Sequence, residues 1–116
     1  MRDADCLFCT IVAGEIPSTV VADRGGVFAF RDVNPKAPTH ILLIPKDHVK
    51  DVSSLDASSG QILGELISVA NELAVSEGIA ESGYRIVANV GPHAGQTVFH
   101  LHLHLLGGRA MAWPPG

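Results

Sequence analysis

The chain has 116 residues, with 8 lysines and arginines against 12 aspartates and glutamates, a net charge of −4 and 47% hydrophobic residues. This length suffices for one hydrophobic core, so we expect a single domain over residues 1–116. The mildly acidic balance argues against broad binding of nucleic acid or of an anionic membrane surface. The first residues lack a long apolar region and no later segment approaches the length of a membrane span, so we expect a cytoplasmic protein.

The first half of the chain predicts one short helix and three strands. Residues 6–13 can form two helical turns, and Gly14 gives a stop signal. The glycines within residues 24–26 favour a hairpin between the first two strands, and the prolines of residues 32–38 predict a rigid loop before the third. These strands are expected at residues 19–23, 27–31 and 40–44.

A long helix is predicted over residues 58–77. Ser58 with Gln61 offers a capping box at its start, and Gly78 offers a C-terminal stop. Its apolar residues recur at three- and four-residue spacing and are Ile62, Leu63, Leu66, Ile67, Ala70, Leu73 and Ala74.

The rest of the chain predicts a fourth strand at residues 84–90, a tight loop at 91–96 and a fifth strand at 98–106. Short connections favour an antiparallel sheet with the helices on one face, which is an α+β domain. The proline-rich ending at residues 113–116 carries the only tryptophan, which we expect to pack on another surface such as a partner subunit.

The fifth strand carries the most informative pattern, because histidine and leucine alternate from His100 to Leu105. Alternation on a strand places His100, His102 and His104 on one face, about 6.6–6.8 Å apart, which is room for a phosphoryl group between neighbouring rings. Three interpretations follow: half-buried structural histidines, a metal site of neutral imidazoles, or covalent and acid–base catalysis near neutral pH.

Three segments together resemble one family. Residues 100–106, His-Leu-His-Leu-His-Leu-Leu, resemble the motif of the histidine triad (HIT) superfamily of nucleotide hydrolases and transferases. Residues 30–46, which include Phe-Arg-Asp-Val-Asn-Pro and Ile-Pro-Lys, are similar to the second block of that family. The ending at residues 105–116 resembles the Hint branch, the purine nucleoside phosphoramidases. The resemblance implies a single HIT domain with a five-stranded antiparallel sheet, one long and one short helix, and a sheet that continues across a homodimer.

The resemblance assigns the catalytic roles to three histidines. His102 would be the nucleophile that attacks the α-phosphorus, and His104 would contact a phosphate oxygen or assist proton transfer to the leaving group. His40 would support them through a hydrogen bond. Attack requires one bare ring nitrogen, so the other N–H of His102 must be held by an acceptor, which a backbone carbonyl near His100 could supply.

The resemblance also implies a nucleotide site. Asp32 would accept both ribose hydroxyls, although an aspartate here could equally cap the turn at Asn34. Trp113 would approach a partner's site. The phosphate positions are Asn89, Gly95, Gln96 and Thr97. The purine contacts, each of which periodicity alone would place in the core, are Leu7, Phe8, Ile11, Phe30, Val33 and Leu42.

The two cysteines allow a metal site that is separate from the chemistry. Cys6 and Cys9, with His48 and His100, resemble the four-ligand zinc site of some bacterial members of the superfamily. Such a structural Zn²⁺ would pin the N-terminal helix to the sheet, while no cofactor is required for the reaction. The alternatives are two buried thiols or, less favoured without a surrounding βαβ unit, a redox pair.

Three functions follow. The first is hydrolysis of purine nucleoside phosphoramidates or adenylated amines to a nucleoside monophosphate such as AMP, through a nucleotidyl-histidine intermediate. The second is dinucleoside polyphosphate hydrolysis of the Fhit type, against which the ending at residues 113–116 speaks. The third is a zinc-stabilised nucleotide-binding or scaffold protein without significant turnover.

Overall fold

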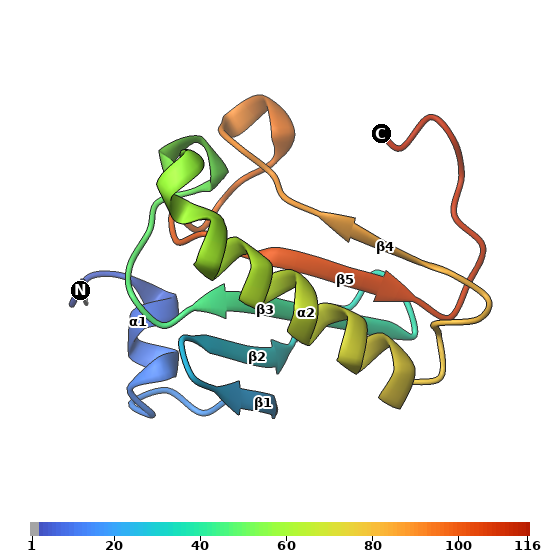
Figure 1. Ribbon diagram of the computed structural model, residues 1–116, viewed down its shortest axis with the longest axis horizontal. Helices are drawn as coiled ribbons and strands as arrows, with labels where there is room; N and C mark the ends of the chain where they lie inside the picture. Colours follow the sequence, from blue (N-terminus) through green and yellow to red (C-terminus); the bar gives the residue numbers. More distant parts are fainter. Residues whose placement is uncertain (1–2) are drawn as a thin grey trace.

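The computed structural model describes residues 3–116, so Met1 and Arg2 of the predicted domain lie outside the described residues. Five strands form one antiparallel sheet in the order β1-β2-β3-β5-β4 (Figure 1). The elements are α1 (Leu7–Val12), β1 (Val20–Arg24), β2 (Val27–Arg31), β3 (Thr39–Pro45), α2 (Gly60–Ser76), β4 (Tyr84–Val87) and β5 (Leu103–Gly107), with single 3₁₀ turns at Val52–Ser54, Ala57–Ser59 and Pro92–Ala94. The predicted α+β class, with a five-stranded antiparallel sheet, one long helix and one short helix, is confirmed.

The hairpin between β1 and β2 is confirmed as a two-residue turn, because Arg24 pairs with Val27. Gly25 has a φ of 54°, in the left-handed region that glycine enters without a steric penalty.

Within the described residues, no helix combines the length and the hydropathy that a membrane crossing needs.

The two helices cover opposite faces of the sheet, so the prediction that they share one face is wrong. Alternate residues of β2 separate the two sides: Val27 and Ala29 pack with α2, whereas Phe28 and Phe30 pack with Phe8 of α1. The sheet centre is apolar on both sides, because β2 and β3 are continuous buried runs, and such a sheet needs cover on both faces. The core on the α1 side contains Cys6, Phe8, Cys9, Ile11, Phe28, Phe30, Leu42 and Ile44.

The long helix lies across the sheet in Figure 1 and begins later than the sequence suggested. The predicted capping box of Ser58 and Gln61 is wrong: the Asp56 carboxylate accepts the Ser58 amide at 2.8 Å, and the Ser59 hydroxyl accepts the Asp56 amide at 3.1 Å. The buried face of α2 consists of Leu66, Val69, Ala70, Leu73 and Ala74, while the predicted apolar residues Leu63 and Ile67 are 38% and 36% exposed.

The last two strands are shorter than predicted, because β4 ends at Val87 and β5 begins only at Leu103. The expectation that all three histidines project from one strand is therefore wrong, since only His104 lies within β5. Pairing between β3 and β5 ends at Leu43 and Leu103, and Pro45, two residues further along β3, has no amide to donate to a longer ladder. The alternation of faces nevertheless continues, since Leu101, Leu103 and Leu105 are all in the core beneath α2.

Candidate functional site

Within residues 3–116, His102 has one ring nitrogen held by a hydrogen bond and the other without a partner. Its Nδ1 lies 2.7 Å from the carbonyl oxygen of His100. A carbonyl oxygen only accepts, so Nδ1 carries the proton and neutral His102 keeps a lone pair on Nε2. The ring is half-buried and packs edge-on against Phe8, with ring centroids 5.2 Å apart. This is the state that a nitrogen nucleophile requires.

His40 and His104 form a directed hydrogen-bond chain beside that ring. The backbone amide of Lys36 donates to Nδ1 of His40 at 3.0 Å, so the proton of neutral His40 is on Nε2. That Nε2 lies 2.8 Å from Nδ1 of His104, which must then accept. Neutral His104 therefore carries its proton on Nε2. The His102 and His104 ring centroids are 5.0 Å apart, so this hydrogen-bond chain ends on a ring that packs against His102.

Burial keeps both imidazole rings of this hydrogen-bond chain, those of His40 and His104, neutral at pH 7. Loss of solvation, with smaller contributions from the nearby His102 and His40, lowers the pKa of His104 to about 4. Burial also lowers the pKa of His40 below 6.5, and the Asp32 carboxylate offsets part of that effect. The free protein therefore presents a neutral N–H donor of His104 to the site.

Asp32 caps the turn at Asn34, which is one of the two roles that the sequence allows for it, and its carboxylate also lies close to His40. Its Oδ1 accepts the Asn34 amide at 2.8 Å, while Oδ2 lies 3.5 Å from Nε2 of His40. Asp32, His40 and His104 offer three potential metal ligands. However, the two imidazole nitrogens are 2.8 Å apart, whereas two nitrogens on one tetrahedral Zn²⁺ stand about 3.3 Å apart. This distance favours a hydrogen bond.

Four of the six predicted purine contacts form an apolar wall on the α1 side of the sheet. They are buried and belong to one cluster, Phe8, Ile11, Phe30 and Leu42. Phe8 packs edge-on against Phe30 with centroids 5.4 Å apart, so this wall adjoins His102 through Phe8. Leu7 is 46% exposed, and Val33 at 98% projects into solvent.

The predicted phosphate positions lie in and around the loop before β5. Gly95 has a φ of 86° and ends the turn at Pro92–Ala94, and Thr97 is exposed. The Gln96 side chain is buried and fully used inside the protein: it accepts the Gly91 amide and donates to the carbonyls of Lys50 and Val98. Gln96 therefore fixes the shape of the loop that carries Thr97.

The structure does not bring all these positions into one cavity. Thr97 and Leu7 line an open cavity of about 530 Å³ beside the N-terminal segment. Asn89 lines a different one, of about 540 Å³, together with the C-terminal Pro115. Trp113 is 82% exposed.

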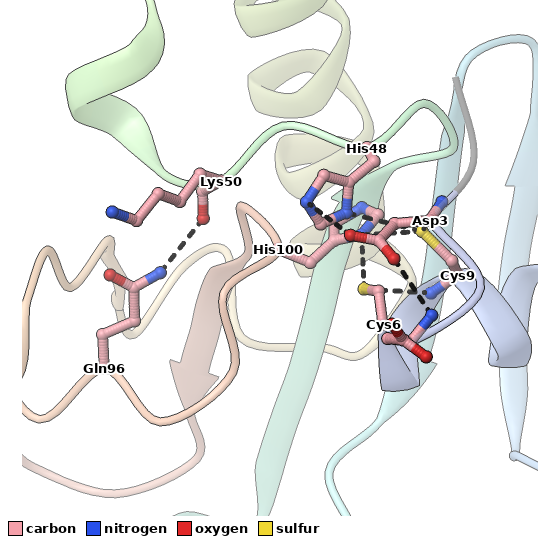
Figure 2. Close-up of polar contacts among 8 residues, drawn as sticks. Asp3, Cys6, Cys9, His48, Lys50, Gln96 and His100 are labelled. Atoms are coloured by element: carbon pink, nitrogen blue, oxygen red, sulfur yellow. Dashed lines mark hydrogen bonds and ion pairs between the residues drawn. The ribbon is translucent and has the colours of Figure 1, made fainter.

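The four predicted metal ligands converge where α1 meets the end of β3 (Figure 2). Cys6 and Cys9 come from the N-cap and the first turn of α1, His48 from the segment after β3, and His100 from the segment before β5. The Nδ1 atom of His100 lies 3.2 Å from Sγ of Cys6 and 3.5 Å from Sγ of Cys9, which in turn lies 3.5 Å from Nδ1 of His48. All four ligand atoms lie within 4.8 Å of one another.

This geometry and donor set fit a tetrahedral zinc ion. Bond lengths of about 2.3 Å to sulfur and about 2.0–2.1 Å to nitrogen give a sulfur–nitrogen edge of about 3.5 Å, which matches the observed separations. The single lone pair on Nδ1 of His100 cannot accept a hydrogen bond from both thiols, whereas one cation can bind all three atoms. Burial lowers the pKa of His100, which keeps this ligand neutral, and raises the pKa of the Cys6 thiol, whose ionisation a cation would favour.

Partners outside the ligand shell orient these side chains. Nε2 of His100 donates to the Pro45 carbonyl at 2.7 Å. The Asp3 amide lies 3.4 Å from Sγ of Cys9, and its carboxylate lies 4.0 Å from Nε2 of His48. Metal-ligating histidines usually have such a partner on their second nitrogen.

Sequence reasoning missed most of the groups that orient the histidines, because they are backbone atoms. The Lys36 amide and the Pro45 carbonyl fix the proton positions of His40 and His100, yet no side-chain pattern marks them. The carbonyl of His100 was anticipated on chemical grounds. Asp3 was missed, and its place shortly before Cys6 was the available signal.

Known proteins resemble this chain in sequence over most of its length. The HIT domain family matches residues 13–111. The chain is 51% identical over 118 residues to the 14 kDa zinc-binding protein of Zea mays, covering 100% of this chain and 91% of that protein. It is 48% identical over 107 residues to the purine nucleoside phosphoramidase of Escherichia coli strain K12, covering 92% and 90%.

The same fold occurs in a solved structure, that of a HIT family hydrolase from Legionella pneumophila Philadelphia 1. The two structures superpose with a TM-score of 0.94 at 50% sequence identity, over 97% of this chain and 100% of the other. Similarity therefore extends over nearly the whole chain.

Proposed function

The chain belongs to the histidine triad (HIT) family of nucleotide hydrolases, and we propose that it is a purine nucleoside phosphoramidase of the Hint branch. The substrates are purine nucleoside phosphoramidates or adenylated amines, and the product is a nucleoside monophosphate. The observation that carries this proposal is the hydrogen bond between Nδ1 of His102 and the His100 carbonyl, because it leaves the lone pair of Nε2 free on a ring that packs against His104.

In the first step, the Nε2 lone pair of His102 attacks phosphorus and the P–N bond to the amine breaks. The amine needs a proton to leave. Burial holds the pKa of His104 at about 4 in the free protein, but the negative phosphoryl group of a bound substrate favours the protonated ring. A proton taken up on binding occupies Nδ1 of His104, and the Nε2–H of His40 then donates to the Asp32 carboxylate, whose Oδ2 lies 3.5 Å away. His104 donates its Nε2 proton to the leaving nitrogen, which leaves Nε2 bare.

In the second step, water attacks phosphorus and the bond to His102 breaks. Neutral His104 accepts a proton from the water, and His102 returns with its Nδ1 still donating to the His100 carbonyl. In the free protein, the Lys36 amide donates to His40 and His40 donates to Nδ1 of His104. These two hydrogen bonds keep the proton of His104 on Nε2, the nitrogen that would face the substrate. Asp32 is proposed to bind the ribose hydroxyls, and the wall around Phe8 the purine.

Replacing the nucleophile tests this function. We expect His102→Ala to lower turnover of a fluorogenic adenosine phosphoramidate by at least about a thousandfold, with AMP affinity and fold retained. The matched control is His93→Ala, because His93 is an exposed histidine of the turn at Pro92–Ala94 and has no role in the proposed chemistry. Turnover in His102→Ala equal to the control would refute the assignment, and negligible turnover in the wild type despite tight AMP binding would favour a scaffold protein.

We also propose that Cys6, Cys9, His48 and His100 hold one structural Zn²⁺. The fit of the four ligand atoms and the similarity to a protein named as zinc-binding support this. When bound, the ion would contribute a closed cross-link between α1 and the sheet and no chemistry at phosphorus. Elemental analysis of protein purified without chelator should give about one Zn²⁺ per chain, and Cys6→Ser with Cys9→Ser should abolish it. Metal far below one per chain in the wild type would refute this site.

The assembly that we propose is a cytoplasmic homodimer. Leu63 and Ile67 form an exposed apolar pair one turn apart on α2, and β4 is a sheet edge with no second neighbour among residues 3–116. The exposed Trp113 stands on a tail fixed by the bond from Arg85 to the Ala112 carbonyl, and it would reach the site of the partner subunit. The second subunit would thereby complete each nucleotide site.

A further inference from the structure

The backbone that orients His102 lies outside the sheet ladder. Pairing between β3 and β5 ends at Leu43 and Leu103, so the carbonyl of His100 is not placed by strand pairing. Two other contacts hold this segment: the Leu101 amide donates to the Val49 carbonyl at 2.6 Å, and Nε2 of His100 donates to the Pro45 carbonyl. The segment that follows β3 therefore takes over the role of a neighbouring strand.

That segment is itself tied to the cysteine-histidine cluster. His48 directly precedes Val49, and its Nδ1 faces Sγ of Cys9. His48 also packs edge-on against the His100 ring, with centroids 5.0 Å apart at 89°. The four ligands thus connect α1, the segment after β3 and the segment before β5 at one point (Figure 2).

A second connection runs through α1. Sγ of Cys6 accepts the Cys9 amide at 3.4 Å and so caps this six-residue helix. Phe8 lies between the two cysteines and contacts both the His100 ring, with centroids 6.0 Å apart, and the His102 ring. The position of α1 therefore limits where the His102 ring can turn.

We propose that the metal-loaded cluster positions the nucleophile: Cys6, Cys9 and His48 fix His100, and through its carbonyl they fix the orientation and proton position of His102. This proposal rests on the zinc site and on the phosphoramidase function. Without the ion, His100 and α1 lose their common anchor, and the carbonyl that selects Nδ1–H on His102 is free to move. Only part of the population then presents a bare Nε2, so the metal controls the rate of nucleotidyl transfer from a site that touches no substrate atom.

The test compares two replacements of one ligand. His48→Ala removes a ligand, whereas His48→Cys restores one, because Nδ1 lies only two bonds from Cβ and a sulfur can reach a similar point. Lys50→Ala is the matched control, since its exposed ammonium lies over Phe99 and not on the cluster. For each protein we would measure metal per chain, the nitrogen-15 NMR signature of the His102 ring, and the single-turnover rate at saturating substrate.

The proposal predicts that His48→Ala loses the metal, loses the hydrogen-bonded Nδ1–H signal of His102, and transfers the nucleotidyl group about 10–100-fold more slowly. His48→Cys should recover the metal, the signal and most of the lost rate, and Lys50→Ala should match the wild type. If His48→Ala fails to fold, the wild type stripped by chelator and then given Zn²⁺ provides the same comparison, and signal and rate should follow the metal reversibly.

Two outcomes would overturn the coupling: metal-free protein that keeps both the ring signature and the wild-type rate, or a wild type that binds no metal. Both are distinct from failure of the phosphoramidase function, which would show as a wild type without turnover. In that case a ring signature that still follows the metal would support the positioning role by itself.

Discussion

At the residue scale, the proton positions of the histidines follow from which neighbours can only donate and which can only accept. The Lys36 amide can only donate and the His100 carbonyl can only accept, so His40 and His102 carry their protons on different ring atoms. In their neutral forms the two histidines thereby present different ring atoms. One continues a donor chain to His104, and the other presents a bare nitrogen.

The low pKa of His104 predicts an acid-sensitive fold. An unfolded histidine takes up a proton near pH 6.5, whereas folded His104 does so near 4, so the unfolded state binds more protons between these values. The free energy of unfolding should therefore fall as the pH is lowered from about 6.5 to about 4. His104→Asn should remove on the order of 1–3 kcal/mol of this fall, as measured by urea denaturation at each pH.

The wild type supplies the comparison for this variant, because the histidines of the metal cluster are present in both proteins and contribute equally. Parallel curves of unfolding free energy against pH for the two proteins would contradict a depressed pKa at His104. Direct titration of the ring by NMR would give the same answer independently.

At the element scale, the close approach of β5 to the chain after α2 requires a glycine at position 107. A Cβ there would lie 2.5 Å from Cδ1 and 3.0 Å from Cβ of Ile79, which is itself buried. We expect Gly107→Ala to destabilise the fold by about 1–3 kcal/mol in chemical denaturation. Gly60→Ala is the control, because a Cβ there meets nothing within 4 Å and its φ is −57°; it should be neutral or stabilising. Equal stability of the two variants would contradict the packing described for β5.

Periodicity was sufficient to predict most elements, because the apolar spacing of residues 58–77 and the glycines of the hairpin act locally. It failed for residues 98–102, where alternation persists but no partner strand is present. The Leu101 amide bonds instead to the Val49 carbonyl, so the end of the ladder depends on the course of the chain after β3, which local spacing does not reveal. The same limit applied to the helices, since local spacing shows that a face is apolar but not which side of the sheet it covers.

The candidate site could likewise be predicted from sequence only in part. Side chains with a specific motif, such as the triad and the two cysteines, were identified from sequence, and the structure places them in two adjoining groups. The backbone groups that orient them have no sequence signature. The nucleotide positions Val33 and Trp113 are exposed in the single chain, so their assigned roles need a ligand or a second subunit.

At the scale of the whole molecule, the proposed homodimer depends on the exposed apolar pair of α2. Ile67→Glu should convert the dimer to a monomer, because an interface that buries a charge without a partner is strongly disfavoured. Light scattering coupled to size exclusion measures this directly, with Glu72→Gln on the same helix as the control. The outcome against the proposal is an Ile67→Glu variant that remains dimeric, or a wild type that is monomeric throughout.

If Nε2 of His102 bonds to phosphorus during turnover, the adenylyl group can be trapped on that ring. Wild-type protein mixed with an adenosine phosphoramidate and quenched rapidly in base, where P–N bonds survive, should gain the mass of one adenylyl group. Peptide mass mapping should place the added group on His102. A wild type that turns over with the adenylyl group on a different residue, or with none at any reaction time, would contradict the account.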